Sequence, residues 1–545
     1  MKNLIALFLI SLTYFSGFAQ QSNFSKQDTL RGSITRERIW WNLLHYNLDF
    51  KVDPASKSIE GSNIIRYKVL SENQLMQIDL QPPMKITSVL QNNKYLEYIR
   101  DGNVYYITLK RVQEVGDENK IKIEFKGAPK VSNNPPWDDG FTWSKDKNEN
   151  DFIATSCQGG GASIWWPCKD HMYDEPDEGI ELSITAPKHL MGVANGRLIN
   201  TKENSDNTKT HTWEVLNPIN NYGVNINIGD YVHFSEKYEG KKGKLDCDYY
   251  VLSYNLEKAK KQFADATRTL EAFEHWFGPY PFYEDSFKLV EVPYLGMEHQ
   301  SSVTYGNGYQ NGYRGRDLSG TGWGLKFDFI IVHESGHEWF ANSITNIDMA
   351  DMWIHESFTA YSESLFLDYH FGTEASNAYV IGTRKSIKND RPIIGYYDVN
   401  NSGSSDMYYK GSNMLHTLRQ IIDNDEKWRT ILLELNKEFY HKNVNTKQIE
   451  NYLNTHIKID LESFFEQYLR TTKIPILEYK IKNNHLTYKW SNIVDGFSTP
   501  IKVFINSNEQ LITPSKVWKK LQLDKSITSF YVDKNFYVDL KNKSN

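Results

Sequence analysis

Cysteine is scarce in this chain, with 3 among 545 residues. No two of them form a C-x-x-C pair, which argues against a zinc site built on cysteine. The odd count leaves at least one thiol free in any pattern of disulfides. Cys157 and Cys168 can pair with each other, but we expect these two and Cys247 to be buried small apolar residues.

The chain also lacks an excess of basic residues. Its 62 Lys and Arg against 68 Asp and Glu give a net charge of −6, which argues against nucleic acid as a partner. After residue 19 no stretch is apolar enough to cross a membrane. There is no internal repeat, no low-complexity segment and no indication of an oligomeric state. The length favours about two to four domains.

The first residues have the pattern of a secretory signal. Lys2 gives a positive start, residues 4–15 are mostly apolar, and Gly17 and Ala19 offer a small-x-small cleavage site before Gln20. We therefore predict a signal peptide over residues 1–19 and a periplasmic or secreted protein. A retained N-terminal anchor is the alternative.

The spacing of apolar residues along the sequence changes twice and divides the rest of the chain into three parts. Alternating apolar and polar residues predict an antiparallel β-saddle or β-sandwich over residues 20–252. Helical spacing begins at Asn255 and dominates residues 253–472, where Asn445 and Gln448 form a capping pair. Alternation returns over residues 473–545 and predicts a small C-terminal β-sandwich. The fold class is therefore a multidomain α+β protein.

One stretch carries the chemistry. His333 and His337 stand four residues apart, which places both imidazoles on one face of a helix. Glu334 completes the pattern H-E-x-x-H, in which two histidines hold zinc and the glutamate is the base for a metal-bound water. Glu356 lies nineteen residues after His337. This separation is long enough for the chain to turn back and form a second helix that brings Glu356 to the histidines as a third ligand.

Chance occurrence of the motif is the alternative, since two surface histidines on a helix usually bind nothing. The flanks are strongly apolar here, from Phe329 to Val332 and at Trp339 and Phe340. A helix with such flanks should be buried, and buried histidines and carboxylates are costly without a partner such as zinc.

Further motifs support a family resemblance. W-F-A-N at residues 339–342, Y-x-K-G at residues 408–411 and G-M-E-H at residues 296–299 accompany H-E-x-x-H and Glu356. Together these motifs resemble the aminopeptidase N family of zinc metallopeptidases over residues 40 to 470. The resemblance implies a thermolysin-like catalytic domain over residues 253–472 and one zinc ion held by His333, His337 and Glu356.

The resemblance also implies roles for other residues. Glu334 would be the general base, and Tyr408 would donate a hydrogen bond to the substrate carbonyl oxygen. Glu298, assisted by Gln158, would bind the free ammonium group of a peptide, and Gly296 and Met297 would offer backbone groups to the substrate. By this resemblance, the catalytic residues would be Glu334 and Tyr408, and the substrate-binding residues would be Glu298, Gln158, Gly296 and Met297.

Glu363, seven residues after Glu356, resembles the family carboxylate that orients a ligand imidazole; a surface glutamate on a helix is the alternative. The chain departs from the family pattern at Leu295, His299, His355 and Ser357, none of which is a proposed zinc ligand. These departures bear on the choice of N-terminal residue more than on activity.

The sequence thus predicts a zinc aminopeptidase that acts on peptides with a free N-terminus. A thermolysin-like endopeptidase and a catalytically silent peptide-binding protein on the same scaffold are the alternatives. Hydrolysis of a lipid epoxide is a third alternative, which is supported only by the family resemblance.

Overall fold

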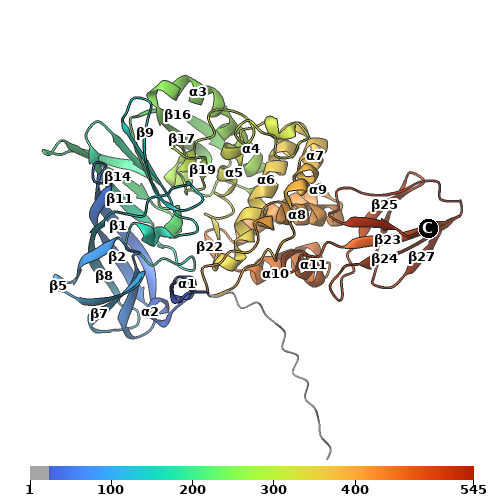
Figure 1. Cartoon of the computed structure of the whole chain (residues 1–545), viewed down its shortest axis with the longest axis horizontal. Coiled ribbons are helices and arrows are strands. Elements are labelled where there is room, and N and C mark those ends of the chain that lie inside the picture. Colours follow the sequence, from blue (N-terminus) through green and yellow to red (C-terminus); the bar gives the residue numbers. More distant parts are fainter. Residues whose placement is uncertain (1–23, 545) are drawn as a thin grey trace, which may run out of the picture.

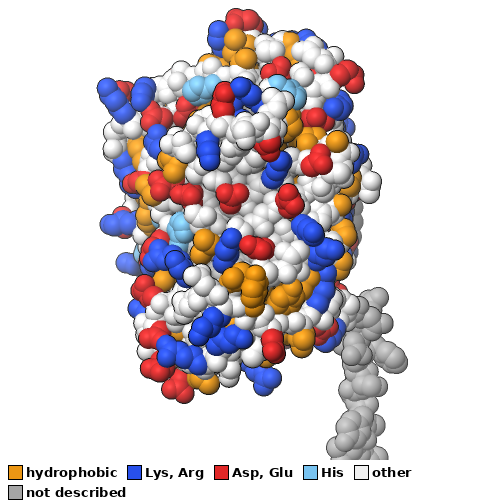
Figure 2. Space-filling view, turned by 90° about the vertical axis from the view of Figure 1, so that its left-hand side faces the viewer, with side chains coloured by type: hydrophobic (Ala, Val, Ile, Leu, Met, Phe, Trp, Pro, Cys, Tyr) orange, Lys and Arg blue, Asp and Glu red, His pale blue; other side chains and the backbone are white. Residues whose placement is uncertain are grey.

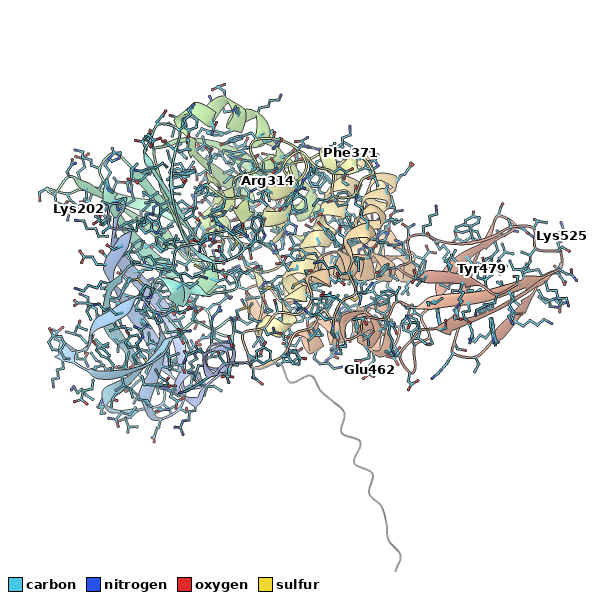
Figure 3. The ribbon with its side chains drawn as sticks, in the orientation of Figure 1. Lys202, Arg314, Phe371, Glu462, Tyr479 and Lys525 are labelled. Carbon is cyan, nitrogen blue, oxygen red and sulfur yellow. The ribbon has the colours of Figure 1, made fainter. Side chains whose placement is uncertain are left out.

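The computed structural model describes residues 24–544, so the predicted signal peptide lies outside the described residues. Figure 1 shows β-sheets at the N-terminal end, a helical part in the middle and a separate β part at the C-terminal end. Lys202 and Lys525, labelled in Figure 3, lie at opposite ends of this elongated molecule. The multidomain α+β fold class is confirmed.

An eight-stranded sheet forms one layer of the N-terminal part. Its strands alternate between buried and exposed residues, as in β1, where Leu48 and Phe50 are buried and Asp49 is not. All neighbours are antiparallel except β1 and β11, which pair in parallel. In spatial order the strands are β13 (Arg197–Glu203), β14 (Thr208–Val215), β11 (Ile180–Pro187), β1 (Trp41–Asp53), β2 (Ser58–Val69), β8 (Glu118–Gly127), β4 (Lys85–Gln91) and β5 (Lys94–Tyr95).

Two smaller sheets complete this part and share its hydrophobic core, to which Trp165 and Trp166 contribute fully buried side chains. One of the smaller sheets ends next to the site described below. Their strands are β3 (Asn73–Asp79), β7 (Val104–Gln113) and β6 (Glu97–Asp101) in the first, and β12 (Met191–Ala194), β15 (Ile226–Gly229), β10 (Asp151–Ser156) and β9 (Gly140–Lys145) in the second.

A five-stranded sheet links the N-terminal β part to the helices. Its strands are β16 (Tyr231–Gly240), β17 (Gly243–Leu252), β18 (Phe287–Glu291), β20 (Val303–Tyr305) and β19 (Gly296–Met297). Strands from both sides of residue 252 therefore share one sheet. The domain boundary placed there stays a prediction.

The helical part contains the helices α3 (Leu256–Gln262), α4 (Ala264–Phe277), α5 (Phe329–Gly336), α6 (Trp353–Phe371), α7 (Thr373–Thr383), α8 (Tyr409–Ile422), α9 (Asp425–Glu438), α10 (Thr446–Ile457) and α11 (Glu462–Leu469). The capping pair is confirmed, since Asn445 and Gln448 form a reciprocal capping box at the start of α10. Asn255 makes no side-chain cap; its amide donates to Glu291 Oε1 at 2.6 Å instead. The helical stretch after it is also broken at Phe263, which ends α3 and precedes α4.

The C-terminal part consists of a four-stranded and a three-stranded sheet, as the alternation in the sequence predicts. The first contains β27 (Lys519–Gln522), β24 (His485–Ser491), β23 (Ile476–Lys482) and β29 (Asp539–Asn542), and the second β26 (Asn508–Ile512), β25 (Ile501–Ile505) and β28 (Phe530–Val532). The prediction for the cysteines is confirmed as well: Cys157, Cys168 and Cys247 are free and buried.

The outer face of the N-terminal β part, shown in Figure 2, carries Lys and Arg interspersed with Asp and Glu. This mixture fits the nearly balanced charge of the whole chain. Within residues 24–544, the helices are all too short or too polar to span a membrane.

Candidate active site

The two motif histidines lie at the end of α5. Asp328 starts this helix, because its carboxylate accepts hydrogen bonds from two backbone N–H groups of the first turn at 3.1 and 3.3 Å. The helix ends at Gly336, but His337 keeps helical angles, with φ −66° and ψ −17°. His333 and His337 therefore stay one turn apart, with ring centroids separated by 5.0 Å.

Glu356 completes a cluster with these histidines from the first turn of α6. Its Oε2 atom lies 3.4 Å from Nε2 of His337 and 3.8 Å from Nε2 of His333. The carboxylate is 2% exposed, and Oε2 has no hydrogen-bond partner among residues 24–544. A buried carboxylate oxygen without a partner is costly, so this atom needs a cation.

The outer nitrogen of each imidazole is fixed by a hydrogen bond. Nδ1 of His333 lies 2.7 Å from Oε1 of Glu363, whose Oε2 accepts from the hydroxyl of Tyr379 at 2.6 Å. Nδ1 of His337 lies 2.9 Å from the backbone carbonyl oxygen of Phe340. These acceptors place the proton of each ring on Nδ1. Both Nε2 lone pairs are thereby left free for a metal.

The donor set fits zinc. Ligand atoms of His333, Glu334 and His337 lie within 4.8 Å of one another, and Glu356 adds the third donor of a His₂Glu set, which leaves an open position in a tetrahedral zinc site. Burial, together with the nearby carboxylates of Glu298 and Glu356, raises the pKa of Glu334 to about 7. A divalent cation would offset this accumulation of buried negative charge.

We expect Glu363→Gln to weaken zinc binding by about 10- to 100-fold, because the variant removes the negative charge behind His333. Competition titration with a coloured chelator measures this affinity. Glu374→Gln in α7, at an exposed position, is the matched control and should bind zinc as the wild type does. An unchanged affinity of Glu363→Gln would show that this carboxylate does not support the zinc site.

A carboxylate and an amide close the cluster on one side. Nε2 of Gln158 donates to Glu298 Oε1 at 2.6 Å and to Glu356 Oε1 at 3.3 Å. Glu298 follows β19 and is 3% exposed, and burial raises the pKa of its carboxyl. The amide of Asn342 donates to the backbone carbonyl oxygen of Glu298 at 2.9 Å and holds this turn in place.

A cavity of about 480 Å³ opens in front of the cluster. It is wide enough for a few peptide residues, within the usual range for ligand sites. Nine predicted residues line it, namely Gln158, Gly296, Met297, Glu298, His333, Glu334, His337, Glu356 and Tyr408. Glu363, the remaining predicted residue, lies behind His333 instead.

Tyr408 lies immediately before α8 and stacks on His333, with ring centroids 6.0 Å apart. Burial, with the charge of Glu356 second, raises the pKa of its phenol well above the ordinary value. The phenol therefore keeps its proton at neutral pH and can act as a hydrogen-bond donor towards the cavity.

The departures from the family pattern have distinct places. Nε2 of His355 accepts the backbone N–H of Asn346 at 2.9 Å, and Ser357 Oγ donates to the carbonyl oxygen of Met407 at 2.6 Å. Both side chains therefore support loops near the site. His299 is buried, with its Nδ1 atom 3.3 Å from the hydroxyl of Thr304, whereas Leu295 lines the cavity.

Three supporting residues were missed by the sequence analysis. Thr359, whose hydroxyl lies 3.1 Å from Nδ1 of His337, follows Glu356 by about one turn of α6, so helical spacing could have indicated it. Asn342 belongs to the W-F-A-N motif and was available as a candidate. Tyr379 lies on another helix, α7, and no local signal in the sequence connects it to Glu363.

Comparisons with known proteins agree with this arrangement. The family model described as "Peptidase M1 N-terminal domain" matches residues 42–222, and "Peptidase family M1 domain" matches residues 262–468. "Probable aminopeptidase 1" of Sulfurisphaera tokodaii is 20% identical in an alignment of 511 positions that covers 88% of this chain and 60% of that protein. The chain thus spans less than two thirds of this relative. "Leukotriene A-4 hydrolase" of Xenopus laevis is 23% identical, in an alignment that covers 77% of this chain and 69% of that protein.

Among solved structures, an M1 zinc metallopeptidase from Deinococcus radiodurans, bound to a Tyr-Ser-Ala substrate, has a TM-score of 0.69. The match covers 81% of this chain and 96% of the other chain at 18% identity. At this identity it supports the similarity of the folds alone. The two M1 models together cover well over half of the sequence, and the resemblance noted from the motifs is confirmed. The chain belongs to peptidase family M1.

Proposed function

We propose that the protein is a zinc-dependent aminopeptidase that removes the N-terminal residue from peptides with a free N-terminus. The observation that carries the proposal is the position of Glu298 and Gln158. Both side chains line the cavity and contact each other, and the Gln158 amide also reaches Glu356, so a free amino group has a buried carboxylate to bind within reach of the cluster. The M1 relative from Sulfurisphaera tokodaii, named an aminopeptidase, supports the same activity.

The chain's own residues supply the rest of the chemistry. Zinc held by His333, His337 and Glu356 would activate a water molecule and polarise the scissile carbonyl group. Glu334 lines the same cavity and would take a proton from the attacking water and deliver it to the leaving amine. The Tyr408 hydroxyl would donate to the oxygen that gains negative charge, which is typically worth about 3–4 kcal/mol of barrier.

Glu298 distinguishes this proposal from a thermolysin-like endopeptidase. A buried carboxylate pairs well with the ammonium group of a free N-terminus, through a charge-assisted hydrogen bond. An internal residue of a long peptide brings only neutral amides to that position, which would leave the carboxylate desolvated and unpaired. The geometry therefore favours removal of terminal residues.

Glu298→Gln tests this assignment. We expect kcat/KM for free peptides to fall about 30-fold or more, because loss of one partner of a buried charge pair costs ~2–5 kcal/mol. Zinc content should not change, since Glu298 is not among the three proposed ligands. Initial rates on aminoacyl fluorogenic substrates, with zinc measured in the same samples, provide the readout.

Glu257→Gln is the matched control, because that side chain is 83% exposed. It should leave kcat/KM unchanged. If Glu298→Gln cleaved free peptides as fast as the wild type, the carboxylate would have no role in binding the amine. A wild-type protein that holds zinc but releases no amino acid would point to the silent binding protein instead.

We further propose that the protein is exported and acts in the periplasm or outside the cell. The support is the pattern of residues 1–19, with Lys2, an apolar run and a cleavage site before Gln20. The N-terminal sequence of protein isolated from its native source tests this proposal. It should begin at Gln20, and retention of Met1 would contradict cleavage.

A further inference from the structure

The helix α1 (Lys26–Gly32) lies outside both family models, which begin at residues 42 and 262. Ser25 caps it through a reciprocal capping box with Asp28. Figure 1 shows α1 where the N-terminal β part meets the helical part of the molecule. From this position α1 can contact both parts of the molecule.

Contacts on both sides tie α1 to the two parts. On the side of the β part, Oε1 of Gln27 accepts the backbone N–H of Asn103 at 2.7 Å. On the side of the helical part, the carbonyl oxygen of Asp28 accepts the backbone N–H of Asn400 at 3.1 Å. Gly32 packs so closely on this loop that a Cβ atom there would lie 2.1 Å from the carbonyl carbon of Val399. The helix is therefore held tightly against the segment that precedes Tyr408.

The side chain of Arg31 extends from α1 to the glycine-rich segment beside the cavity. Its Nη1 donates to the carbonyl oxygen of Gly159, which also accepts from the amide of Asn400 at 3.2 Å. Nε of Arg31 lies 3.5 Å from Oδ2 of Asp170, and the arginine side chain is 13% exposed. From the opposite side, Asp139 accepts the backbone N–H of Gly159 at 3.1 Å. The carbonyl and the N–H of Gly159 are thus both fixed by other elements.

Gly159 directly follows Gln158, the residue whose amide contacts Glu298 and Glu356. Three consecutive glycines without such contacts would have wide conformational freedom. We infer that Arg31 is a positioning residue: by holding the carbonyl of Gly159, it fixes Gln158 and with it the subsite for the peptide's free amino group. This inference rests on the aminopeptidase function proposed above.

Arg31→Met tests the inference, because it keeps an apolar stem of similar length but removes every donor. We expect kcat/KM for free peptides to fall on the order of tenfold to a hundredfold, as misplacement of a binding group commonly does. Zinc content should stay that of the wild type. Arg31→Lys, which keeps a single donor nitrogen, should recover part of the loss. Arg36→Met is the control, because Arg36 is 88% exposed and forms an ion pair with its neighbour Glu37.

A double-mutant cycle separates positioning from a general structural role. If Arg31 acts through Gln158, then Arg31→Met should have little further effect in a Gln158→Ala background. Independent losses that multiply in the double variant would overturn the inference, as would full activity of Arg31→Met. Should Arg31→Met fail to fold, Asn400→Ala, which removes the second donor to Gly159, enters the same cycle with the same criteria. Failure of the proposed function itself would look different, because the wild type would then release no N-terminal residue.

Discussion

Glu334→Gln should lower kcat for free peptides by about 10²–10⁴-fold, the usual contribution of a general acid–base group. The amide has nearly the shape of the carboxylate, but it cannot take a proton from the attacking water. The side chain lines the cavity beside both histidines without being one of the three proposed zinc ligands. Zinc content should therefore remain that of the wild type, and substrate should still bind.

Steady-state kinetics with metal analysis on the same preparation measures both quantities. Glu462→Gln is a suitable control, since Glu462 is exposed on α11 at the lower edge of the helical part (Figure 3) and is not among the residues that line the cavity, and the variant should keep full activity. A Glu334→Gln protein with wild-type kcat would mean that another group takes the proton. Loss of zinc together with activity would instead make Glu334 a metal ligand.

Removal of zinc should abolish turnover and lower the temperature of unfolding. Without the ion, Glu298, Glu334 and Glu356 remain buried within one cavity, and the part of the chain that the structure describes offers Oε2 of Glu356 no hydrogen bond. A ligand present at 100 times its Kd stabilises the folded state by about 2.7 kcal/mol. Chelation followed by dialysis should therefore give an inactive protein with a lower Tm, and added zinc should restore both properties.

His333→Ala is the genetic counterpart of chelation. It removes one donor and also leaves Glu363 without its partner at Nδ1, so activity should fall below detection and added zinc should not restore it. His233→Ala, at a half-exposed position, is the control and should respond to chelator and zinc as the wild type does. Zinc-independent turnover in the chelated protein would contradict the proposed metal chemistry.

Local signals in the sequence were sufficient for much of the fold. The period of two in β1 and the capping box of Asn445 and Gln448 depend on neighbouring residues, and both are present in the structure. The parallel pairing of β1 with β11 joins Tyr46 to Ile180, and no local pattern reports such a distant partner. The break at Phe263 was missed because the helical spacing of apolar residues continues on both sides of it, while tertiary packing decides where one helix ends and the next begins.

The candidate site likewise contains some contacts that the sequence predicts and others that it does not. Helical spacing brings His333 to His337 and Glu356 to Glu363, so residue types and spacing were enough to propose these pairs. The contact between Gln158 and Glu298 joins residues 140 positions apart, and only the family resemblance suggested it. The acceptor for His337 is a backbone carbonyl, that of Phe340. Every residue carries such a group, so the sequence gives no sign of it.

Cleavage of a matched pair of peptides tests the central claim most directly. Zinc-loaded protein is given one peptide with a free N-terminus and the same peptide with an acetylated N-terminus, and the products are identified by mass spectrometry. The site of Glu298 and Gln158 predicts stepwise loss of single residues from the free peptide and no cleavage of the blocked one. Internal cleavage of the acetylated peptide would contradict the account.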